Sequence, residues 1–274
     1  KKITKAMMDE NFEGVANITR YDHVPLIGLS FGSVLELRKI IHESDLVYIN
    51  STYSPVVLWA VALCVSRQVN VVWAPRGAIQ ARLQGSRRSS FLKITFEKVL
   101  GWLLKKCSAA IHVTSDMERT ELSPPFIDIK TFVFPNINFA PLSQRREIHQ
   151  VQNIRFLFLS RIHEKKGIFE LLENPKLPRD LKITLVGPGE PADISKLNAA
   201  ISNRPNTEYL GAVYDEEKKA EILRSNDILI LPSHSENFGN VVIEALNNRL
   251  PVLTTKRVPI DEIDEYDVGK RVDD

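Results

Sequence analysis

Short apolar runs that alternate with longer helical patterns are the feature that most constrains the fold of this 274-residue chain. The runs are continuously apolar, which is typical of strands buried on both faces of a parallel sheet. Because helices between such strands cover the two faces, we predict an α/β doubly wound architecture. The predicted strands are 46–49, 69–73, 110–113, 131–134, 155–159, 182–186, 208–210, 228–231 and 252–254, and the main predicted helices are 34–42, 55–67, 91–107, 194–203, 216–225 and 240–247.

A pause in this alternation at residues 136–152 divides the chain. The segment contains Pro141 and a polar run, and such a stretch is typical of a linker between α/β domains. We therefore predict two domains, residues 1–150 and 151–274. No glycine-rich turn precedes Asp45, and no closing helix precedes Asp274, so we expect the chain to be incomplete at both ends.

The composition limits the cellular compartments and the classes of partner that we expect for this protein. The two cysteines, Cys64 and Cys107, lie in apolar helical stretches, which favours buried thiols over a disulfide framework or a zinc site. We therefore expect a cytoplasmic protein. The formal net charge of +2 gives no indication of a nucleic-acid partner, and no apolar run reaches the ~20 residues of a membrane-spanning helix.

The stretch 82–106 interleaves basic and apolar residues over a predicted helix. The favoured interpretation is a core helix with a solvated basic face. The alternative is a surface that rests on anionic lipid, as a peripheral contact at the inner membrane face.

Two cations follow the predicted strand 155–159. Arg161 and Lys166 precede Gly167 in a segment that leads into a helix, and strand ends of this kind face the ligand crevice of open α/β sheets. A guanidinium fork and a mobile ammonium group both suit a phosphate. Taken alone, the run fits a charged surface loop equally well.

Two glycines, Gly187 and Gly189, come directly after the predicted strand 182–186. Glycine at this point lets a ligand approach the backbone closely. A plain turn is the simpler explanation for this pair alone.

A third segment joins the predicted strand 228–231 to the helix 240–247. The backbone N–H groups around Phe238, Gly239 and Asn240 would stand at the helix start, where an anion is favoured. Glu236 precedes them in the loop, and Glu244 follows about one turn into the helix. A carboxylate can accept paired hydrogen bonds from a vicinal diol of a sugar or ribose. For either glutamate taken alone, the favoured interpretation is a capping residue for Glu236 and a solvated helix face for Glu244.

These motifs follow strands of one predicted domain in order. Together they resemble the donor-binding domain of retaining GT-B glycosyltransferases of glycosyltransferase family 4 (group 1 glycosyl transferases). The Glu-x7-Glu spacing of Glu236 and Glu244 and the strand end at residues 210–213 belong to the resemblance, which covers roughly residues 154–256. It implies a GT-B fold, in which two Rossmann-like domains face a cleft.

The resemblance also implies roles for individual residues. Glu236, Arg161 and Lys166 would form the catalytic set, with the two cations on the donor diphosphate and the glutamate on the donor sugar. The implied donor-binding residues are Gly167, Gly187, Gly189, Val213, Phe238, Gly239, Asn240 and Glu244.

In the first domain the resemblance is looser. Arg76 and Gly77 stand where relatives place an acceptor-facing pair, and Ser115 lies in a Thr-Ser-x-x-Glu segment. Ile137 replaces the glycine of a Pro-Asn-Gly element. The acceptor side of the site is therefore only partly defined by the sequence.

The implied reaction moves a hexosyl group from a UDP- or GDP-sugar to a hydroxyl of a carbohydrate or lipid-linked acceptor, with retention of configuration. Cell-surface polysaccharide or glycolipid synthesis is the expected setting. The resemblance implies that neither a cofactor nor a metal is needed. The histidines His112, His163 and His234 accordingly lack metal-ligand spacing.

Three alternatives belong to other classes. A non-catalytic nucleotide-sugar-binding or scaffold subunit is disfavoured by the complete set of Arg161, Lys166, Glu236 and Glu244. A GT-B-like nucleotide-sugar 2-epimerase would need more carboxylates around the sugar than Glu236. A dinucleotide-dependent oxidoreductase would need a Gly-x-Gly-x-x-Gly opening, which the sequence lacks.

Overall fold

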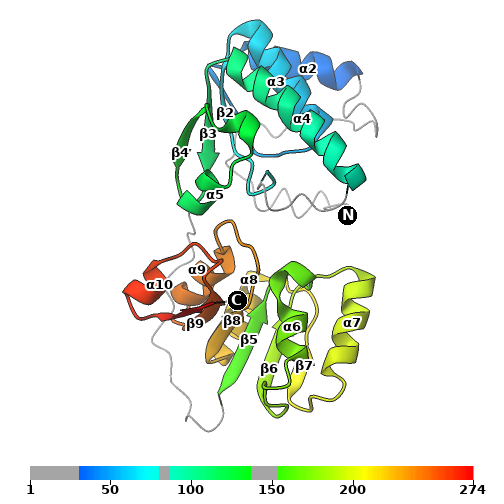
Figure 1. Ribbon diagram of the computed structural model, residues 1–274, viewed down its shortest axis with the longest axis vertical. Coiled ribbons are helices and arrows are strands. Elements are labelled where there is room, and N and C mark those ends of the chain that lie inside the picture. The colour runs from blue at the N-terminus through cyan, green and yellow to red at the C-terminus, as the bar shows by residue number, and fades with distance from the viewer. Residues whose placement is uncertain (1–30, 80–86, 137–153, 274) are drawn as a thin grey trace. The chain divides into compact units, whose positions relative to one another are not determined.

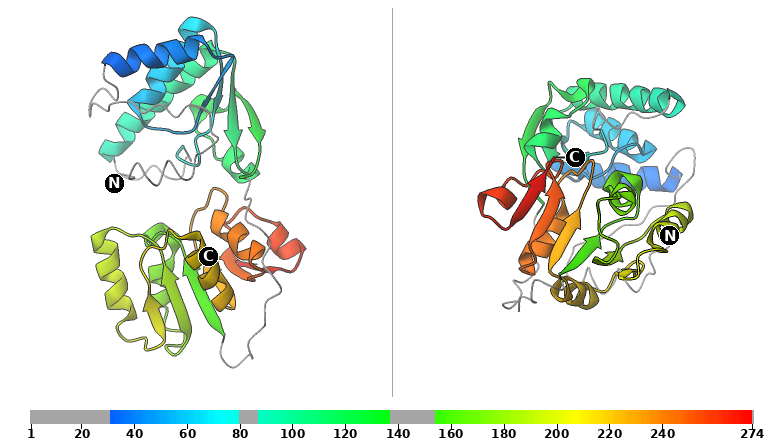
Figure 2. Two further views of the ribbon diagram at one scale, coloured as in Figure 1. Left: turned by 180° about the vertical axis from the view of Figure 1, so that it is seen from behind. Right: turned by 60° about the horizontal axis from the view of Figure 1, so that its bottom comes forward.

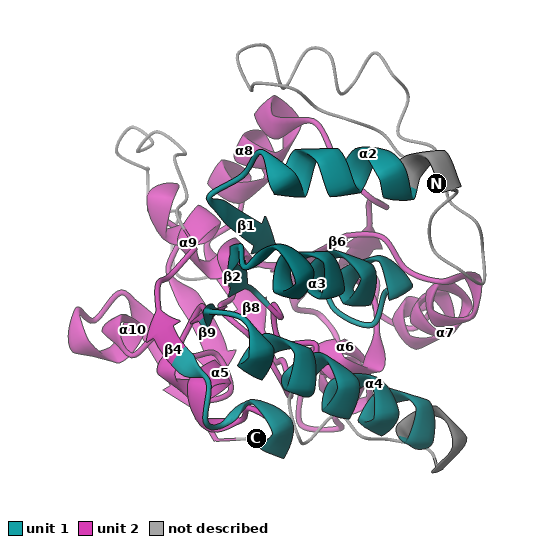
Figure 3. Cartoon of the chain, turned by 90° about the horizontal axis from the view of Figure 1, so that it is seen from above, with its two compact units in different colours: residues 1–74, 84–111, 124–130 teal, residues 75–83, 112–123, 131–274 magenta. Residues whose placement is uncertain are grey.

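The computed structural model describes residues 31–79, 87–136 and 154–273, and contains a four-stranded and a six-stranded sheet (Figure 1). The chain separates into two compact units (Figure 3). Unit 1 comprises residues 1–74, 84–111 and 124–130, and unit 2 comprises residues 75–83, 112–123 and 131–274. The predicted boundary near residue 150 lies outside the described residues and stays a prediction.

The four-stranded sheet has the order β1-β2-β3-β4, and its β1–β2 and β2–β3 pairs are parallel. Its core includes Trp73 and Phe126, whose ring centroids lie 4.7 Å apart. Helix α3 contacts both α2 and α4 (Figure 3). The elements are β1 (Leu46–Ile49), β2 (Asn70–Trp73), β3 (Ala109–Val113), β4 (Lys130–Val133), α2 (Phe31–His42), α3 (Pro55–Arg67), α4 (Arg87–Lys106), α5 (Asp116–Thr120) and the 3₁₀ helix η2 (Pro124–Phe126).

Local sequence explains where α3 begins and ends. The side chain of Ser54 accepts a hydrogen bond from the backbone N–H of Val56, and Pro55 occupies the first turn, where its missing N–H costs nothing. Gln68 ends the helix in the left-handed conformation, with φ 56°.

The six-stranded sheet is parallel throughout, in the order β10-β9-β8-β5-β6-β7 (Figure 2). Numbered from its own first strand, this order is 3-2-1-4-5-6 reversed end to end, which is the doubly wound order of nucleotide-binding sheets. The strand order reverses between β5 and β8, and ligands of such sheets bind beyond the carboxyl ends of the strands at that point. Its strands are β5 (Arg155–Leu159), β6 (Lys182–Val186), β7 (Thr207–Tyr209), β8 (Ile228–Leu231), β9 (Val252–Thr255) and β10 (Gly269–Val272), and its helices are α6 (Ile168–Glu173), α7 (Pro191–Ile201), α8 (Glu216–Ser225), α9 (Asn240–Asn247) and α10 (Glu262–Glu265).

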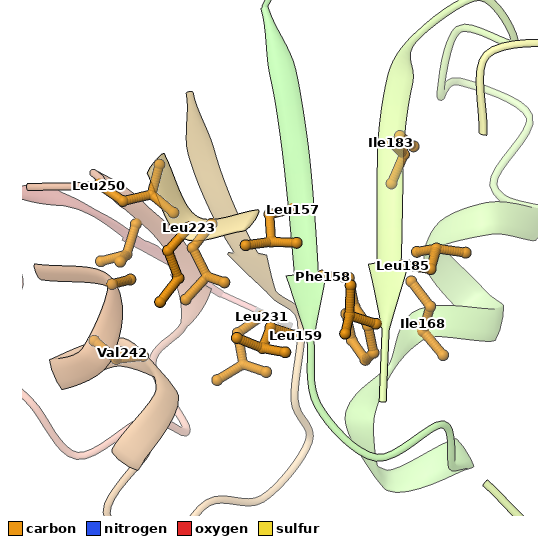
Figure 4. Close-up of a cluster of buried hydrophobic side chains, with 14 of the residues drawn as sticks. Leu157, Phe158, Leu159, Ile168, Ile183, Leu185, Leu223, Leu231, Val242 and Leu250 are labelled. Atoms are coloured by element: carbon orange, nitrogen blue, oxygen red, sulfur yellow. The ribbon is translucent and has the colours of Figure 1, made fainter. Parts of the chain in front are cut away.

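Side chains on both faces of the sheet are buried (Figure 4). Phe158 lies beside Ile168 of α6, whereas the neighbouring Leu157 lies on the side of Leu223 of α8. Because consecutive strand residues point to opposite faces, a sheet covered on both faces needs continuously apolar strands. This confirms the predicted α/β doubly wound class.

Elements outside the prediction are short. Among the described residues they include α5, η2, α10 and β10, and β10 pairs in parallel with β9. The observed ends of several predicted elements differ by a few residues; β4, for example, is Lys130–Val133 rather than 131–134. The first thirty residues lie outside the described part of the chain.

Candidate functional site

The loops that leave β5 and β8 meet at Gly167. This glycine has φ 66°, and a Cβ built on it would lie 1.9 Å from the backbone oxygen of Pro232. The backbone N–H of His234 also donates to the oxygen of Lys165, at 3.0 Å. Gly167 therefore lies where the two loops touch, and its donor-binding role stays a prediction.

Lys166 and Glu236 approach each other from these two loops. Their ammonium group and carboxylate form a hydrogen-bonded ion pair with side chains only 21% and 13% exposed. The buried Ser233 donates its hydroxyl to Glu236 Oε1 at 3.1 Å, and the hydroxyl of Thr255 donates to the Ser233 carbonyl. The carboxylate is thus fixed by a chain of contacts that reaches the end of β9. We did not predict Ser233 or Thr255, since neither carries a charge or a recognisable spacing.

Arg161 stands on the same edge. Its side chain is exposed, and in the described part of the chain its guanidinium makes no hydrogen bond or ion pair. A solvated cation beside an ion pair is well placed to accept an anionic group.

Gly187 supports the adjoining turn after β6. At φ 144°, a Cβ on this residue would meet the Ser160 carbonyl at 1.8 Å. Its N–H donates to the oxygen of Gly211, and its own oxygen accepts the hydroxyl of Tyr209 at 2.8 Å. Gly189 instead lies against Ile162 by a parallel bridge, outside the cavity.

Helix α9 begins at Asn240, directly after Gly239, which has φ 80° and gives no side-chain cap. Its first N–H groups and the helix dipole therefore suit an anion. Glu244 lies in the second turn, where its Oε2 is 3.3 Å from Nζ of Lys219 on α8. Burial alone would lower the pKa of Lys219, but its hydrogen bonds and ion pairs with Glu216 and Glu244 outweigh burial and raise it. Lys219 was not predicted, because its helix has the charge pattern of any solvated helix.

Most of the predicted site residues line a cavity of about 480 Å³. All the residues that line this cavity belong to unit 2. The predicted catalytic residues Arg161, Lys166 and Glu236 line it. The predicted donor-binding residues that line it are Gly187, Val213, Phe238, Gly239, Asn240 and Glu244.

The predicted acceptor-side residues belong to the same compact unit. Arg76 lines the cavity and donates to Asn136 Oδ1 at 2.5 Å, while Gly77 lines an adjoining hollow of about 240 Å³. Ser115 lines neither hollow; its hydroxyl caps α5 by accepting the N–H of Glu118, and donates to the oxygen of Asn237 at 3.0 Å.

Glu118 is the glutamate of the Thr-Ser-x-x-Glu segment, for which no individual role was predicted, and it is a buried carboxylate. It accepts the backbone N–H of Gly77 at 2.5 Å and both the N–H and the hydroxyl of Thr114, at 2.7 and 2.8 Å. Only 1% of this residue is exposed. It therefore ties the turn at Arg76 and Gly77 to the start of α5.

The described residues contain neither a candidate metal-ion cluster nor a candidate membrane-spanning helix. Residues 31–79, 87–136 and 154–273 contain no group of three or more His, Cys, Asp or Glu placed to hold a metal ion. The absence of a metal requirement stays a prediction. Within the same ranges, no helix has the length and apolar character to cross a membrane.

The second half of the chain is similar to a known family. Residues 142–266 match the family described as "Glycosyl transferases group 1". This segment is less than half of the chain. Among curated proteins, the chain is 28% identical over 153 residues to a D-inositol 3-phosphate glycosyltransferase of Arthrobacter sp. (strain FB24), a match that covers 53% of the chain and 36% of that protein.

A second relative has a different name. The lipopolysaccharide glucosyltransferase WaaG of Escherichia coli (strain K12) is 27% identical over 157 residues, which cover 53% of this chain and 39% of WaaG. The matched segments therefore span little more than a third of these relatives.

Solved structures support the fold. A sucrose-phosphate synthase from Thermosynechococcus elongatus superposes with a TM-score of 0.60 at 19% identity, over 89% of this chain and 66% of that one. Anabaena Alr3699/HepE, solved in complex with UDP and glucose, superposes with a TM-score of 0.63 at 16% identity. That match covers 94% of this chain and 72% of the Anabaena chain. At these identities the likeness concerns the fold, which is that of GT-B glycosyltransferases.

Proposed function

We propose that the protein transfers a sugar from a nucleoside diphosphate to an acceptor hydroxyl. The observation that carries the proposal is the cavity at the switch point between β5 and β8, which brings together Arg161, the Lys166–Glu236 pair and the Lys219–Glu244 pair. The match to group 1 glycosyl transferases over residues 142–266 supports the same class of reaction.

Each part of the donor has a chemically matched partner in this cavity. Glu244, fixed by Lys219, would accept the two ribose hydroxyls, and the backbone near Val213 would contact the base. The diphosphate would lie between the start of α9 and the cations Arg161 and Lys166. Glu236 would then hold the donor sugar.

The cations act on the charge that develops during transfer. The bond from the anomeric carbon to the diphosphate oxygen breaks as the acceptor oxygen bonds to that carbon, and negative charge grows on the departing diphosphate. Fixed donors aimed at such a charge typically contribute roughly 3 kcal/mol each. Glu236 holds the ammonium group of Lys166 at this edge of the cavity. Retention of configuration and independence from metal are part of the proposal.

The setting is also proposed. It comprises UDP- or GDP-hexose donors, a carbohydrate or lipid-linked acceptor, and a cytoplasmic place in cell-surface polysaccharide or glycolipid synthesis. The names of the two relatives, one for an inositol phosphate and one for a lipopolysaccharide, support only the acceptor part of this proposal.

A thermal-shift screen followed by an activity assay tests the proposal. UDP-, GDP- and ADP-sugars are added separately to the full chain, and a donor that binds only the folded state raises the unfolding midpoint. The stabilising donor is then tested for hydrolysis and for transfer to sugar and lipid-linked acceptors. A midpoint that no nucleotide sugar raises would contradict the site. Stabilisation without turnover would instead favour a non-catalytic nucleotide-sugar-binding subunit.

A further inference from the structure

Helix α4 in unit 1 presents an apolar surface to solvent that the proposed reaction does not use. Phe91, Leu92 and Trp102 are 72%, 73% and 60% exposed, and Val99 is exposed as well. Exposed large apolar side chains are unremarkable one at a time, but a contiguous group of them marks an interaction site.

The exposed residues of α4 share one side of the helix. At about 100° per residue, the exposed positions from Phe91 onward fall within an arc of roughly 140°. They are Phe91, Leu92, Thr95, Lys98, Val99, Trp102, Lys105 and Lys106. We call this set the α4 face.

The opposite side of α4 accounts for its packing in the core. Leu100 and Leu104 are buried, and at Gly101 a Cβ would lie 2.8 Å from the oxygen of Pro125 in η2. Glu97 is also buried, and its carboxylate accepts the hydroxyl of Tyr53. The apolar residues of the α4 face are therefore additional to those the core requires.

Charge on the α4 face has one sign. Glu97 is the only acid among residues 91–106, and it points into the core, so α4 contributes Lys98, Lys105 and Lys106 without an exposed carboxylate. Nζ of Lys106 lies 5.8 Å from the ring centroid of Trp102, and Lys105 pairs with the exposed Asp128 at 3.0 Å. Next to Asp128, Ile127 is 64% exposed and extends the apolar surface.

We propose that the α4 face docks on an anionic phospholipid surface. Aromatic and leucine side chains that enter the headgroup boundary, bordered by lysines that meet anionic headgroups, are the chemistry of a helix lying in the plane of a membrane. A neutral protein groove would match the apolar side chains but leave Lys98 and Lys106 without an anionic partner, whereas Lys105 already pairs with Asp128. For the stretch 82–106, the sequence favoured a core helix with a solvated basic face. The exposure of Phe91, Leu92 and Trp102 supports the alternative, a surface that rests on anionic lipid. This docking does not depend on the proposed sugar transfer.

Vesicle co-sedimentation of the full chain tests the docking. Phosphatidylcholine vesicles with and without phosphatidylglycerol are compared at low and high salt. We expect sedimentation with the anionic vesicles only, weakened by salt, and a blue-shifted fluorescence that Trp102→Phe largely removes. Lys98→Glu should reduce the partition coefficient by more than the roughly fivefold that one lysine contributes near an anionic surface, because it also adds repulsion.

Matched variants separate insertion from misfolding. The double variant Leu92→Ser/Trp102→Ser should lose sedimentation and keep the wild-type circular dichroism spectrum, whereas Tyr266→Ser and Lys176→Glu, at exposed positions of unit 2, should sediment as the wild type does. Absence of wild-type binding at low salt would overturn the proposal. Unchanged vesicle binding by the double variant would also overturn it. A third contrary result would be a wild-type protein that forms a dimer but does not bind vesicles, together with a double variant that is monomeric.

Discussion

Nζ of Lys219 on α8 lies 3.3 Å from Oε2 of Glu244 on α9, so two helices on either side of β8 in the sequence meet through one ion pair at the cavity. The glutamate is recognisable from its spacing to Glu236, but its partner is not. The pair fixes the carboxylate that we assign to the ribose, and it removes the freedom that an isolated glutamate on a helix surface would have.

Replacement of Glu244 should therefore weaken nucleotide binding itself. Glu244→Ala removes the proposed acceptor of the ribose hydroxyls, and hydrogen bonds to a charged group contribute about 1.5–3 kcal/mol each. We expect the affinity for the free nucleoside diphosphate to fall by roughly tenfold or more, measured by calorimetry. Lys219→Met should weaken it less, and Lys218→Met, one residue away, should leave it unchanged. Equal affinity of Glu244→Ala and wild type would refute the ribose role.

Lys166 should matter for turnover more than for folding. Lys166→Ala removes a cation from the proposed leaving group, and losses of this kind are on the order of a hundredfold or more in kcat. Lys176→Ala, at an exposed lysine outside the cavity, provides the control for a change of charge. A Lys166→Ala protein with wild-type turnover would show that the diphosphate departs without this residue.

Gly167 and Gly211 form a matched pair for a stability test, because both have positive φ, 66° and 77°. A Cβ at Gly211 meets nothing within 4 Å, whereas at Gly167 it would meet the Pro232 oxygen. Gly211→Ala should cost only the backbone strain, about 1 kcal/mol. Gly167→Ala should cost roughly 1–3 kcal/mol more, measured by urea unfolding. Equal losses would mean that the loops after β5 and β8 separate easily.

Glu118→Gln should destabilise unit 2 although it nearly preserves the side-chain shape. The carboxylate accepts three hydrogen bonds, and an amide would set an N–H group against the N–H of Gly77 or Thr114. An unsatisfied buried donor costs about 1–3 kcal/mol. Asp116→Asn, which loses only a surface ion pair with Arg119, should cost less than about 1 kcal/mol. If urea midpoints showed Asp116→Asn to be the less stable variant, the stabilising role of the Glu118 hydrogen bonds would be contradicted.

Acid should weaken the contact between α10 and β10. Hydrogen bonds from Arg271 hold the pKa of Asp264 below its usual range. A carboxyl with a lowered folded pKa stabilises the fold above its unfolded pKa of about 3.9, and this contribution is lost as pH falls through the folded value. Asp264→Asn should therefore reduce the loss of stability on acidification, followed by urea midpoints below about pH 5. Asp267→Asn is the control in the same segment. If the stability of Asp264→Asn fell with pH just as that of the wild type does, the proposed role of Asp264 would be excluded.

Much of the fold follows from local sequence. The apolar runs that become β5, β6 and β8 are continuous because both faces of their sheet are covered, and this pattern is visible without a structure. Short edge strands are less visible, as at β10, whose residues Gly269–Val272 carry one valine after two charged side chains. An edge strand of this kind buries too little apolar surface to show a pattern.

The site shows the same division. The sequence alone determined the type of sheet, the positions of Arg161, Lys166, Glu236 and Glu244 in the segments that follow strands, and the resemblance that joins them. Tertiary structure alone decided that Ser233 and Lys219 hold those carboxylates, that Gly167 is a contact between loops, and that Phe91 and Trp102 of α4 face solvent rather than the core. The reason is physical: periodicity along one element records that a side chain is apolar or charged, but the partner it meets is set by crossovers that bring distant strands and helices together.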